Sequence, residues 1–280
     1  MLKTAAKFSK IMNENTALIA GEGILPVEIA KKLHKLQNKT LIIALRDDFE
    51  ILQPYAGKLI HFKKPDLTRG LKEIKSYGAN ELIMAGRIPK KIIYCLPFFF
   101  DKFTLSILKN SLRDDHSLLG AIVKAFENEN IKVIPYWQIL PEFLAPSGTL
   151  SKRKPDNKEL KDIEYAEKIL RVTLPLSFGQ AVCVADEAVV AVEAMEGTDM
   201  MIKRAGNLSK RGVLVKMMKK NQDMRFDLPT VGITTLENMH EAGLTCLAVE
   251  AEKTLIMEPE KFFELADKFN IAVLGVESHE

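Results

Sequence analysis

Short apolar runs alternate with helical patterns along the first half of the chain, and this alternation limits the folds open to it. Five apolar segments of strand length lie at 16–20, 40–45, 58–62, 81–85 and 132–135. Three amphipathic segments with the period of a helix lie between them, at 26–36, 67–77 and 116–127. Strands that alternate with helices predict a parallel sheet with helices on its faces. We therefore expect residues 1–145 to form an N-terminal, Rossmann-like α/β domain.

A polar stretch at 146–158 separates this half from the rest of the chain. It is rich in Pro, Ser, Gly and Lys and has no apolar period, so we expect a linker. Beyond it, helices are expected at 162–172, 236–242 and 260–269, and strands at 181–185, 188–192, 213–217, 246–249 and 271–275. The first two of these strands flank Asp186 and Glu187, which indicates a hairpin. Residues 159–280 are therefore expected to form a second domain of mixed α/β type.

The composition excludes several classes of protein. The chain has 280 residues, enough for two domains, and its 47% apolar and 28% charged residues are typical of a globular protein. A formal charge of only +3 does not demand nucleic acid, so no nucleic-acid partner is expected. No apolar stretch approaches the ~20 residues that span a bilayer, and the N-terminus does not have the pattern of a signal peptide. We expect a cytoplasmic protein that meets any lipid from the water side.

The three cysteines do not form a zinc pattern. Cys95, Cys183 and Cys246 lie in apolar surroundings without close Cys or His neighbours, and three cysteines cannot all pair within one chain. Buried free thiols in a reducing cytoplasm are therefore expected.

The densest chemistry of the sequence lies between Glu193 and Asp227. Five carboxylates occur there, at Glu193, Glu196, Asp199, Asp223 and Asp227. The cations between them include Lys203, Arg204, Lys210, Arg211, Lys216 and Arg225. Carboxylate oxygens suit Mg²⁺, whereas Arg and Lys bind phosphate oxygens. Carboxylates beside cations predict a site that handles phosphate and a divalent metal.

Two segments of this region also have structural interpretations. Thr198 or Asp199 can cap the helix expected after them, but a cap explains only one of the surrounding charges. If 222–227 is extended, Asp223, Arg225 and Asp227 share one side of it. That side is either the ion-pair face of an edge strand or a pair of carboxylates for Mg²⁺ or water beside an arginine for phosphate. The spacing alone does not decide between these alternatives.

Two segments of the first half also lie where ligands bind. Gly21, Gly23 and Pro26 lie where a strand is expected to lead into a helix, a place that can hold a phosphate. The dinucleotide fingerprint needs a third glycine where Pro26 stands, so a tight turn without a ligand is an equal alternative. Asp114 and Asp115 precede the helical segment at 116–127. Either is a good N-cap, and as a pair they can bind a ribose hydroxyl or a metal.

Several motifs along the chain resemble those of the LpxI family. They are Gly-Glu-Gly-Ile-Leu-Pro at 21–26, Ala-Gly-Arg-Ile at 85–88, Arg-Asp-Asp-His at 113–116, Leu-Ser-Phe-Gly-Gln at 176–180, Glu-Gly-Thr-Asp at 196–199 and Gln-Asp-Met-Arg-Phe-Asp-Leu-Pro at 222–229. The most specific of these motifs is the Gln-Asp-Met-Arg-Phe-Asp segment at 222–227. The resemblance implies a UDP-2,3-diacylglucosamine pyrophosphatase of lipid A biosynthesis. Such a hydrolase yields UMP and 2,3-diacylglucosamine 1-phosphate (lipid X).

The resemblance also suggests roles for individual residues. The implied catalytic residues are Asp223, Asp227, Arg225, Glu196 and Asp199, of which Asp223 and Asp227 would also bind Mg²⁺ or another divalent cation. The implied substrate-binding residues are Gly21, Gly23, Asp114, Asp115, Gln180, Lys203, Arg204, Lys216 and Gln222. The N-terminal domain would hold the nucleotide and the C-terminal domain the lipid sugar phosphate. The implied partners are the UDP-linked diacylated sugar lipid and the cytoplasmic surface of the inner membrane, bound peripherally, and a homodimer is left open.

Two other functions account for part of the sequence. A nucleotide-dependent oxidoreductase fits the N-terminal pattern, but the third glycine is missing. A non-catalytic nucleotide-sugar-binding protein fits the first half, but not the charged region that begins at Glu193. The LpxH type of enzyme, which catalyses the same overall reaction, has a metallophosphoesterase pattern that includes Gly-Asn-His. That motif is absent here.

Overall fold

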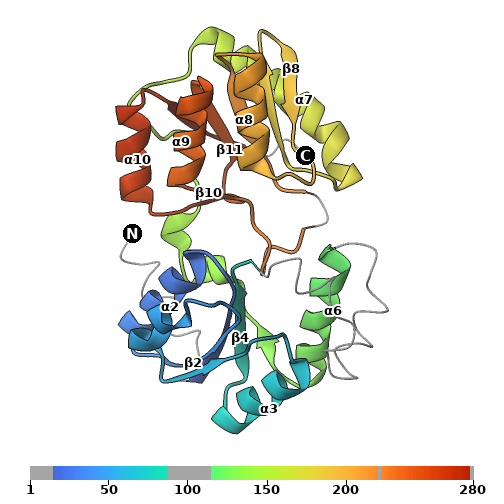
Figure 1. The fold of residues 1–280 in the computed structure, drawn as a ribbon, viewed down its shortest axis with the longest axis vertical. Helices are drawn as coiled ribbons and strands as arrows, with labels where there is room; N and C mark the ends of the chain where they lie inside the picture. The colour runs from blue at the N-terminus through green and yellow to red at the C-terminus, as the bar shows by residue number, and fades with distance from the viewer. Residues whose placement is uncertain (1–14, 88–114, 220–221, 278–280) are drawn as a thin grey trace. The chain divides into compact units, whose positions relative to one another are not determined.

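A computed structural model describes residues 15–87, 115–219 and 222–277. The chain divides into two compact units between Pro141 and Glu142, and each unit is a sheet with helices packed on it (Figure 1). The predicted α/β class is confirmed, with a parallel sheet in the first unit and a mixed sheet in the second. Cys95 and Asp114 lie outside the described residues. None of the helices in the described ranges has the length and apolar character needed to cross a bilayer.

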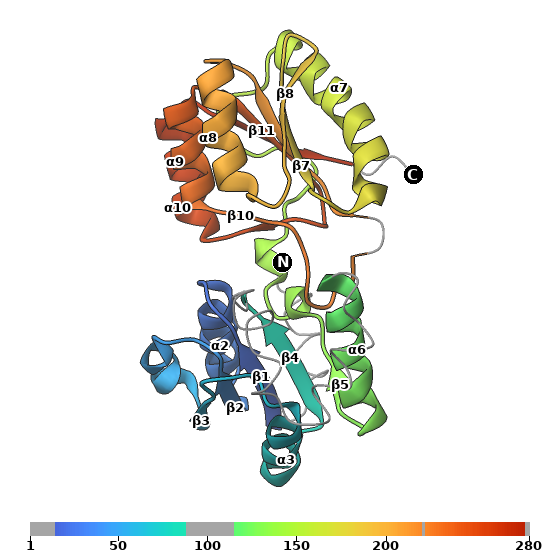
Figure 2. The same cartoon turned by 45° about the vertical axis from the view of Figure 1, so that its right-hand side comes forward.

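The first unit contains five parallel strands in the order β3-β2-β1-β4-β5. The strands are β1 (Asn15–Ala20), β2 (Lys39–Ala44), β3 (Lys58–His61), β4 (Glu81–Ala85) and β5 (Lys132–Val133). The helices are α2 (Leu25–Lys35), α3 (Leu67–Tyr77) and α6 (Asp115–Asn128), with 3-10 helices η1 (Phe49–Tyr55) and η3 (Tyr136–Gln138). Figure 2 shows β1, β4 and β5 side by side, with α6 next to β5. The strand order reverses at β1, so the switch point of the sheet lies between β1 and β4.

Local signals determine where α3 begins and ends. The Asp66 carboxylate accepts a hydrogen bond from the Arg69 N–H at 2.8 Å before the first turn. Gly78 follows the last turn in the left-handed conformation, with a φ of 76°. A carboxylate cap and a glycine stop are common helix ends that can be recognised in a sequence. The predicted bounds of α3 are confirmed accordingly.

The second unit contains six strands in the order β6-β13-β11-β9-β7-β8. These strands are β6 (Gly148–Thr149), β7 (Ala181–Ala185), β8 (Ala188–Val192), β9 (Val213–Lys216), β11 (Cys246–Glu250) and β13 (Ala272–Val276), and β10 (Thr230–Val231) pairs separately with β12 (Leu255–Ile256). The helices are α7 (Asn157–Thr173), α8 (Thr198–Leu208), α9 (Ile233–Ala242) and α10 (Pro259–Lys268), with the 3-10 helix η5 (Leu174–Leu176). A further 3-10 helix, η4 (Pro141–Phe143), contains the boundary between the two units. β9, β11 and β13 are parallel, whereas β6, β7 and β8 run antiparallel to their neighbours.

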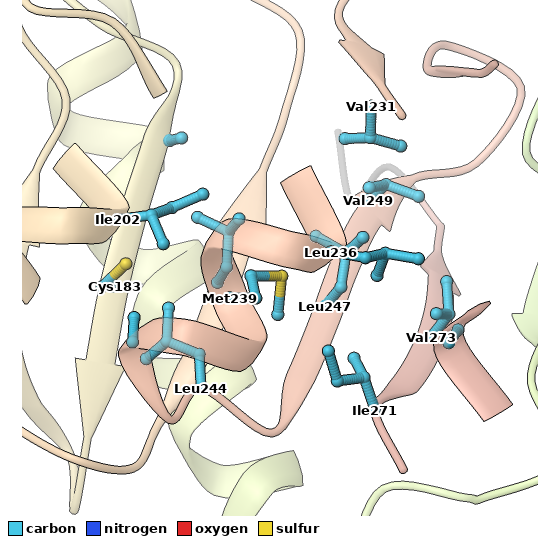
Figure 3. Packing of buried hydrophobic residues seen from close by; sticks show 14 of the residues in the cluster. Cys183, Ile202, Val231, Leu236, Met239, Leu244, Leu247, Val249, Ile271 and Val273 are labelled. Carbon is cyan, nitrogen blue, oxygen red and sulfur yellow. The ribbon is translucent and has the colours of Figure 1, made fainter. Parts of the chain in front are cut away.

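Apolar side chains fill both faces of this second sheet. Cys183 and Leu247 lie on the face that packs against Ile202 of α8 and Met239 of α9 (Figure 3). Their strand neighbours belong to a separate core with α7, which contains Val182, Val184, Ala248, Ile163, Ala166 and Leu170. Successive strand residues point to opposite faces, so strands that are covered on both faces are apolar throughout.

The two cysteines of the described ranges are buried and free, as predicted. Burial raises the pKa of the Cys183 thiol to about 12 and raises that of Cys246 as well. Both thiols are therefore protonated at neutral pH and act as small apolar side chains.

The predicted hairpin between β7 and β8 is confirmed. Asp186 and Glu187 both have a positive φ, of 52° and 55°, which a tight two-residue turn of this kind requires. The buried carboxylate of Asp162 on α7 accepts their two backbone N–H groups at 3.2 and 2.6 Å. The turn is thus held by a helix that precedes it in the sequence.

The stretch 146–158, which is predicted to be a linker, is bonded into the second unit instead. β6 pairs with β13, and the Ser151 hydroxyl accepts the Val273 N–H at 2.7 Å. The Arg153 guanidinium binds the Glu159 carboxylate at 2.7 and 2.9 Å and donates to the Asn270 carbonyl at 2.8 Å. Polar composition indicates a linker only when the polar groups have no partners. Here Asn270 and Val273, which bond to Arg153 and Ser151, lie more than a hundred residues later, so the composition of the 146–158 stretch does not predict these hydrogen bonds.

Candidate active site

Polar side chains gather at one edge of the second sheet. β9 and β11 are parallel and end at this edge with Lys216 and Glu250. β7 is antiparallel to β9 and begins there after Gln180, and β8 ends there before Glu193. Ligands of open α/β sheets bind outside the carboxyl ends of the parallel strands. The sheet therefore brings residues from four separate segments to a place where a ligand is expected.

Thr198 links two buried charges at this edge. Its hydroxyl donates to Glu193 Oε1 at 2.9 Å and accepts from Lys216 Nζ at 3.2 Å. Glu193 Oε2 accepts the Gln180 N–H at 3.0 Å, and Lys216 Nζ donates to the Thr230 carbonyl at 2.9 Å. Only 8% of Glu193 and 7% of Lys216 are exposed. We call Glu193, Thr198 and Lys216 the buried network.

Lys216, which is predicted to contact phosphate, has its ammonium directed at protein groups. Burial lowers the pKa of this ammonium, and the negative charges of Glu193 and Asp199 oppose that shift. An ammonium has three donors, and two of them are used by Thr198 and Thr230. At most one donor of Lys216 is left for a ligand.

Neither Thr198 nor Asp199 caps α8, so the capping alternative does not hold. The helix begins at Thr198, after Gly197 with a φ of 81°, and no side chain caps it. The Thr198 hydroxyl is bonded within the buried network, and Asp199 lies exposed in the first turn. Glycine reaches the positive φ at residue 197 without steric cost, so the chain can turn sharply between Glu193 and the helix.

Glu196 and Arg204, two predicted site residues, are paired with each other. The Glu196 carboxylate accepts from Arg204 Nη2 at 2.6 Å, and the same nitrogen donates to the Val192 carbonyl at 2.8 Å. The hydrogen bond from Arg204 lowers the pKa of Glu196. Lys203 is exposed beside this pair on α8. The pair uses one oxygen of Glu196 and one nitrogen of Arg204, so any ligand at this place meets the two side chains as an ion pair.

The chain that follows β9 is held at the same edge. The Met218 N–H donates to Glu250 Oε2 at 2.7 Å, and the Lys219 N–H donates to Gln222 Oε1 at 2.9 Å. Glu250 and Gln222 are both buried. Glu250 was not predicted from the sequence, because its acceptor role depends on a partner 32 residues earlier. The only signal for it was a carboxylate at the end of an apolar strand.

Residues 223–227 form a turn, so the extended conformation on which both interpretations of this segment were based is not present. The Asp223 carbonyl accepts the N–H groups of Phe226 and Asp227 at 3.3 and 3.1 Å. Its carboxylate accepts the Arg225 N–H at 2.9 Å and binds the Arg225 guanidinium at 2.7 and 3.0 Å. Aspartate often bonds to the backbone two residues later, and this local bond competes with strand formation.

The turn leaves one ionised carboxylate next to one guanidinium. Burial opposes ionisation of Asp223, but the hydrogen bonds from Arg225 outweigh it and lower the pKa. Asp223, Arg225 and Asp227 are all half-buried. In the described ranges, no three carboxylate, His or Cys side chains converge on a common point. A metal in this region would draw on one or two carboxylates and on oxygens of a ligand.

The glycine turn of the first unit lies at the switch point of its sheet. Gly23 has a φ of 99°, and α2 begins after it with Pro26 in its first turn. A Cβ on Gly21 would lie 2.7 Å from the Arg87 carbonyl oxygen, so a larger residue does not fit. Glu22 and Arg87 exchange backbone hydrogen bonds at 2.8 and 3.0 Å and pair their side chains at 3.2 Å. The segments after β1 and β4 are thus joined.

Arg46, which was not predicted from the sequence, follows β2 and binds the same turn. Its Nη1 donates to the Gly23 carbonyl at 2.7 Å and approaches the Gly21 carbonyl at 3.4 Å. Its Nε and Nη2 each bind the Asp48 carboxylate at 2.7 Å. The available signal was an Arg-Asp-Asp triplet directly after an apolar strand. Among the other predicted binding residues, Asp115 is the first residue of α6.

One unit with a glycine turn at its switch point and another with a charged sheet edge are typical of two-domain α/β proteins that bind phosphorylated ligands. The LpxI N-terminal domain model matches residues 15–143, and the LpxI C-terminal domain model matches residues 146–274. The chain therefore belongs to the LpxI family, as its motifs predict. It is 30% identical over 277 residues to the UDP-2,3-diacylglucosamine pyrophosphatase LpxI of Caulobacter vibrioides, a match that covers 94% of this chain and 98% of that protein.

Proposed function

We propose that this protein hydrolyses the pyrophosphate bond of UDP-2,3-diacylglucosamine to UMP and 2,3-diacylglucosamine 1-phosphate. The observation that carries the proposal is the match to both LpxI domains, supported by 30% identity over 94% of the chain to a relative named for this activity. The alternatives of an oxidoreductase and of a binding protein without activity gain no support from these comparisons.

The polar edge of the second sheet, where β9 and β11 end with Lys216 and Glu250, is called the charged edge, and its chemistry suits this reaction. A pyrophosphate resists attack because its negative charges repel a nucleophile, and cationic groups offset that repulsion. We assign phosphate contacts to Arg225 and Lys203. We assign the orientation of the attacking water to Asp223 and Asp227, whose turn holds carboxylates beside the Arg225 guanidinium. The lowered pKa of Asp223 keeps its carboxylate ionised at neutral pH, and an ionised carboxylate acts only as a hydrogen-bond acceptor, the role that holding a water requires.

We also propose that a divalent cation takes part, with Asp223 and Asp227 as its protein ligands. Mg²⁺ keeps several waters and needs only one or two carboxylates besides substrate phosphates, whereas structural Zn²⁺ requires four protein ligands and catalytic Zn²⁺ three. The described residues form no cluster of three such ligands, so the donor set fits Mg²⁺ better than Zn²⁺. When bound, the cation would neutralise charge on the pyrophosphate oxygens.

We propose further that the protein meets its lipid at the membrane surface. Phe178 and Met195 lie in the segments next to Gln180 and Glu193, and 44% and 93% of their surfaces are exposed. Apolar side chains beside the charged edge suit a substrate with acyl chains. Cosedimentation with vesicles that contain anionic lipid should retain the wild type. Phe178→Ser with Met195→Ser should weaken this retention, and equal retention of the double variant would contradict the proposal.

The direct test is turnover by the purified protein. UDP-2,3-diacylglucosamine should be converted to equimolar UMP and lipid phosphate, and UDP-N-acetylglucosamine, which lacks the acyl chains, serves as the comparison substrate. Tight binding of the diacylated substrate without release of UMP would contradict hydrolysis and support a nucleotide-sugar-binding protein.

A further inference from the structure

Arg46 is a buried cation with unusual acceptors. Its side chain is 6% exposed, whereas that of its partner Asp48 is 69% exposed. Burial of a guanidinium is unfavourable unless its donors are satisfied, and here they meet two backbone carbonyls of the glycine turn and one carboxylate. We propose that Arg46 is a positioning residue that orients the Gly21–Gly23 turn for the nucleotide phosphate of the substrate. This inference rests on the proposed function and adds a residue to it.

The direction of the peptide groups gives the physical reason. In a trans peptide the C=O and the N–H that follows it point in opposite directions. Arg46 binds the Gly23 carbonyl at 2.7 Å, so the Ile24 N–H is directed away from Arg46. The Gly21 peptide shows the same rule at work. Arg46 approaches its carbonyl at 3.4 Å, and the N–H that follows donates to the Arg87 carbonyl at 2.8 Å.

The start of α2 is left open to an anion by this arrangement. Within the described ranges, the N–H groups of Ile24 and Leu25 reach no backbone acceptor, and no side chain caps the helix. Without Arg46, the Gly23 peptide is free to rotate, and the Ile24 N–H that belongs to it then loses its direction. The buried face of α2, which includes Val27 and Ile29, makes no use of Arg46. Loss of Arg46 should therefore weaken nucleotide binding more than it weakens the fold.

The test compares Arg46→Met with the wild type in three measurements. These are the inhibition constant of UMP, kcat and KM for UDP-2,3-diacylglucosamine, and the thermal unfolding midpoint. The UMP inhibition constant and KM should both rise by at least about tenfold, because a displaced turn no longer meets the phosphate. The kcat should change by less than about threefold, because the lost contact stabilises the bound substrate and the transition state equally. Arg46→Lys keeps the positive charge but loses the planar set of guanidinium donors. Its inhibition constant and KM should lie between those of the wild type and of Arg46→Met.

Two further variants separate positioning from general stability. Lys58→Met removes the Lys58–Glu73 ion pair at 2.9 Å in the same unit and should leave the UMP inhibition constant and KM unchanged. Gly23→Ala adds a Cβ that meets no atom within 4 Å, but it imposes a strained residue at a φ of 99°. It disturbs the turn without touching Arg46, so it should reproduce the rise in both constants.

A folded Arg46→Met protein with the wild-type UMP inhibition constant overturns the positioning role. The positioning role is also overturned if kcat falls in proportion to the folded fraction of the protein while KM and the UMP inhibition constant do not change. A residue with a purely structural role gives that result. If Arg46→Met does not fold, Arg46→Lys and Gly23→Ala decide by the same two constants. A wild-type protein that releases no UMP overturns the proposed function and this inference together.

Discussion

The Lys216 ammonium lies 3.2 Å from the Thr198 hydroxyl, a contact that joins the end of β9 to the first residue of α8. Thr198 also donates to the buried Glu193 carboxylate at 2.9 Å. A neutral side chain thus stands between two buried charges of opposite sign. The arrangement of the charged edge therefore depends on a residue that has no charge of its own.

Thr198→Val should destabilise the protein and reduce turnover. The substitution keeps the shape but removes a hydroxyl, which leaves Lys216 and Glu193 each without one partner. The cost should be about 1–3 kcal/mol in the free energy of unfolding, measured by urea denaturation. Thr198→Ser restores the hydroxyl and should recover most of the stability and of kcat/KM. Equal stability of the Val and Ser variants would show that the network contributes little.

Asp223→Ala should abolish turnover and leave the fold intact. Its carboxylate is half-buried and paired with Arg225, so its loss should cost no more than about 1 kcal/mol of stability. The loss of a group that orients water should reduce kcat on the order of 10²-fold or more. UMP release and circular dichroism provide the measurements. Glu164→Ala, which breaks an exposed pair with Lys168 at 2.8 Å, is the matched control. Activity near that of the control would remove Asp223 from the mechanism.

Turnover should require a divalent cation. The expectation follows from the carboxylates of the 223–227 turn and from a substrate with two phosphates. UMP release should stop after exhaustive chelation and return when Mg²⁺ is added, with the metal content checked by elemental analysis. Zn²⁺ should restore less activity, because the described residues form no three-ligand cluster. Full activity in a metal-free sample would refute this prediction.

Glu159→Gln should destabilise the protein at neutral pH but not at low pH. Burial opposes ionisation of Glu159, but hydrogen bonds from Arg153 and Thr245 outweigh it and lower its pKa below the ordinary 4.5. A carboxyl with a lowered folded-state pKa stabilises the fold above its unfolded pKa, and the contribution disappears as pH falls through the folded value. The variant should lose about 2 kcal/mol at pH 7, and its difference from the wild type should shrink below about pH 4.5.

The control for this prediction lies on the same helix. Glu164→Gln alters an exposed carboxylate that pairs with Lys168 four residues later, and it should leave the free energy of unfolding nearly unchanged from pH 7 to pH 3. A Glu159→Gln difference that stays constant from pH 7 to pH 3 would show that the Arg153 pair is not the cause.

Local pattern was enough to predict the longer helices and strands and the family, but not the two-residue strands β6, β10 and β12. Apolar period, an Asp cap and a glycine stop determined α3, and alternation of strands with helices predicted a parallel sheet. These signals act over a few residues, where backbone geometry and side-chain spacing are set by the chain itself. The Gln-Asp-Met-Arg-Phe-Asp segment likewise pointed to LpxI without any knowledge of its conformation.

Only the tertiary structure decided which polar groups meet. An extended 222–227 segment would have put Asp223, Arg225 and Asp227 on one side, but the Asp223 carboxylate bonds to Arg225 and closes a turn. The sequence suggested a linker at 146–158, but the Arg153 guanidinium donates to the carbonyl of Asn270, which lies 117 residues later in the chain. Arg46 reached the Gly21–Gly23 turn through the pairing of β1 with β2, which no local pattern announces. A hydrogen bond depends on a partner within about 3 Å, and folding alone brings residues that are distant in sequence that close.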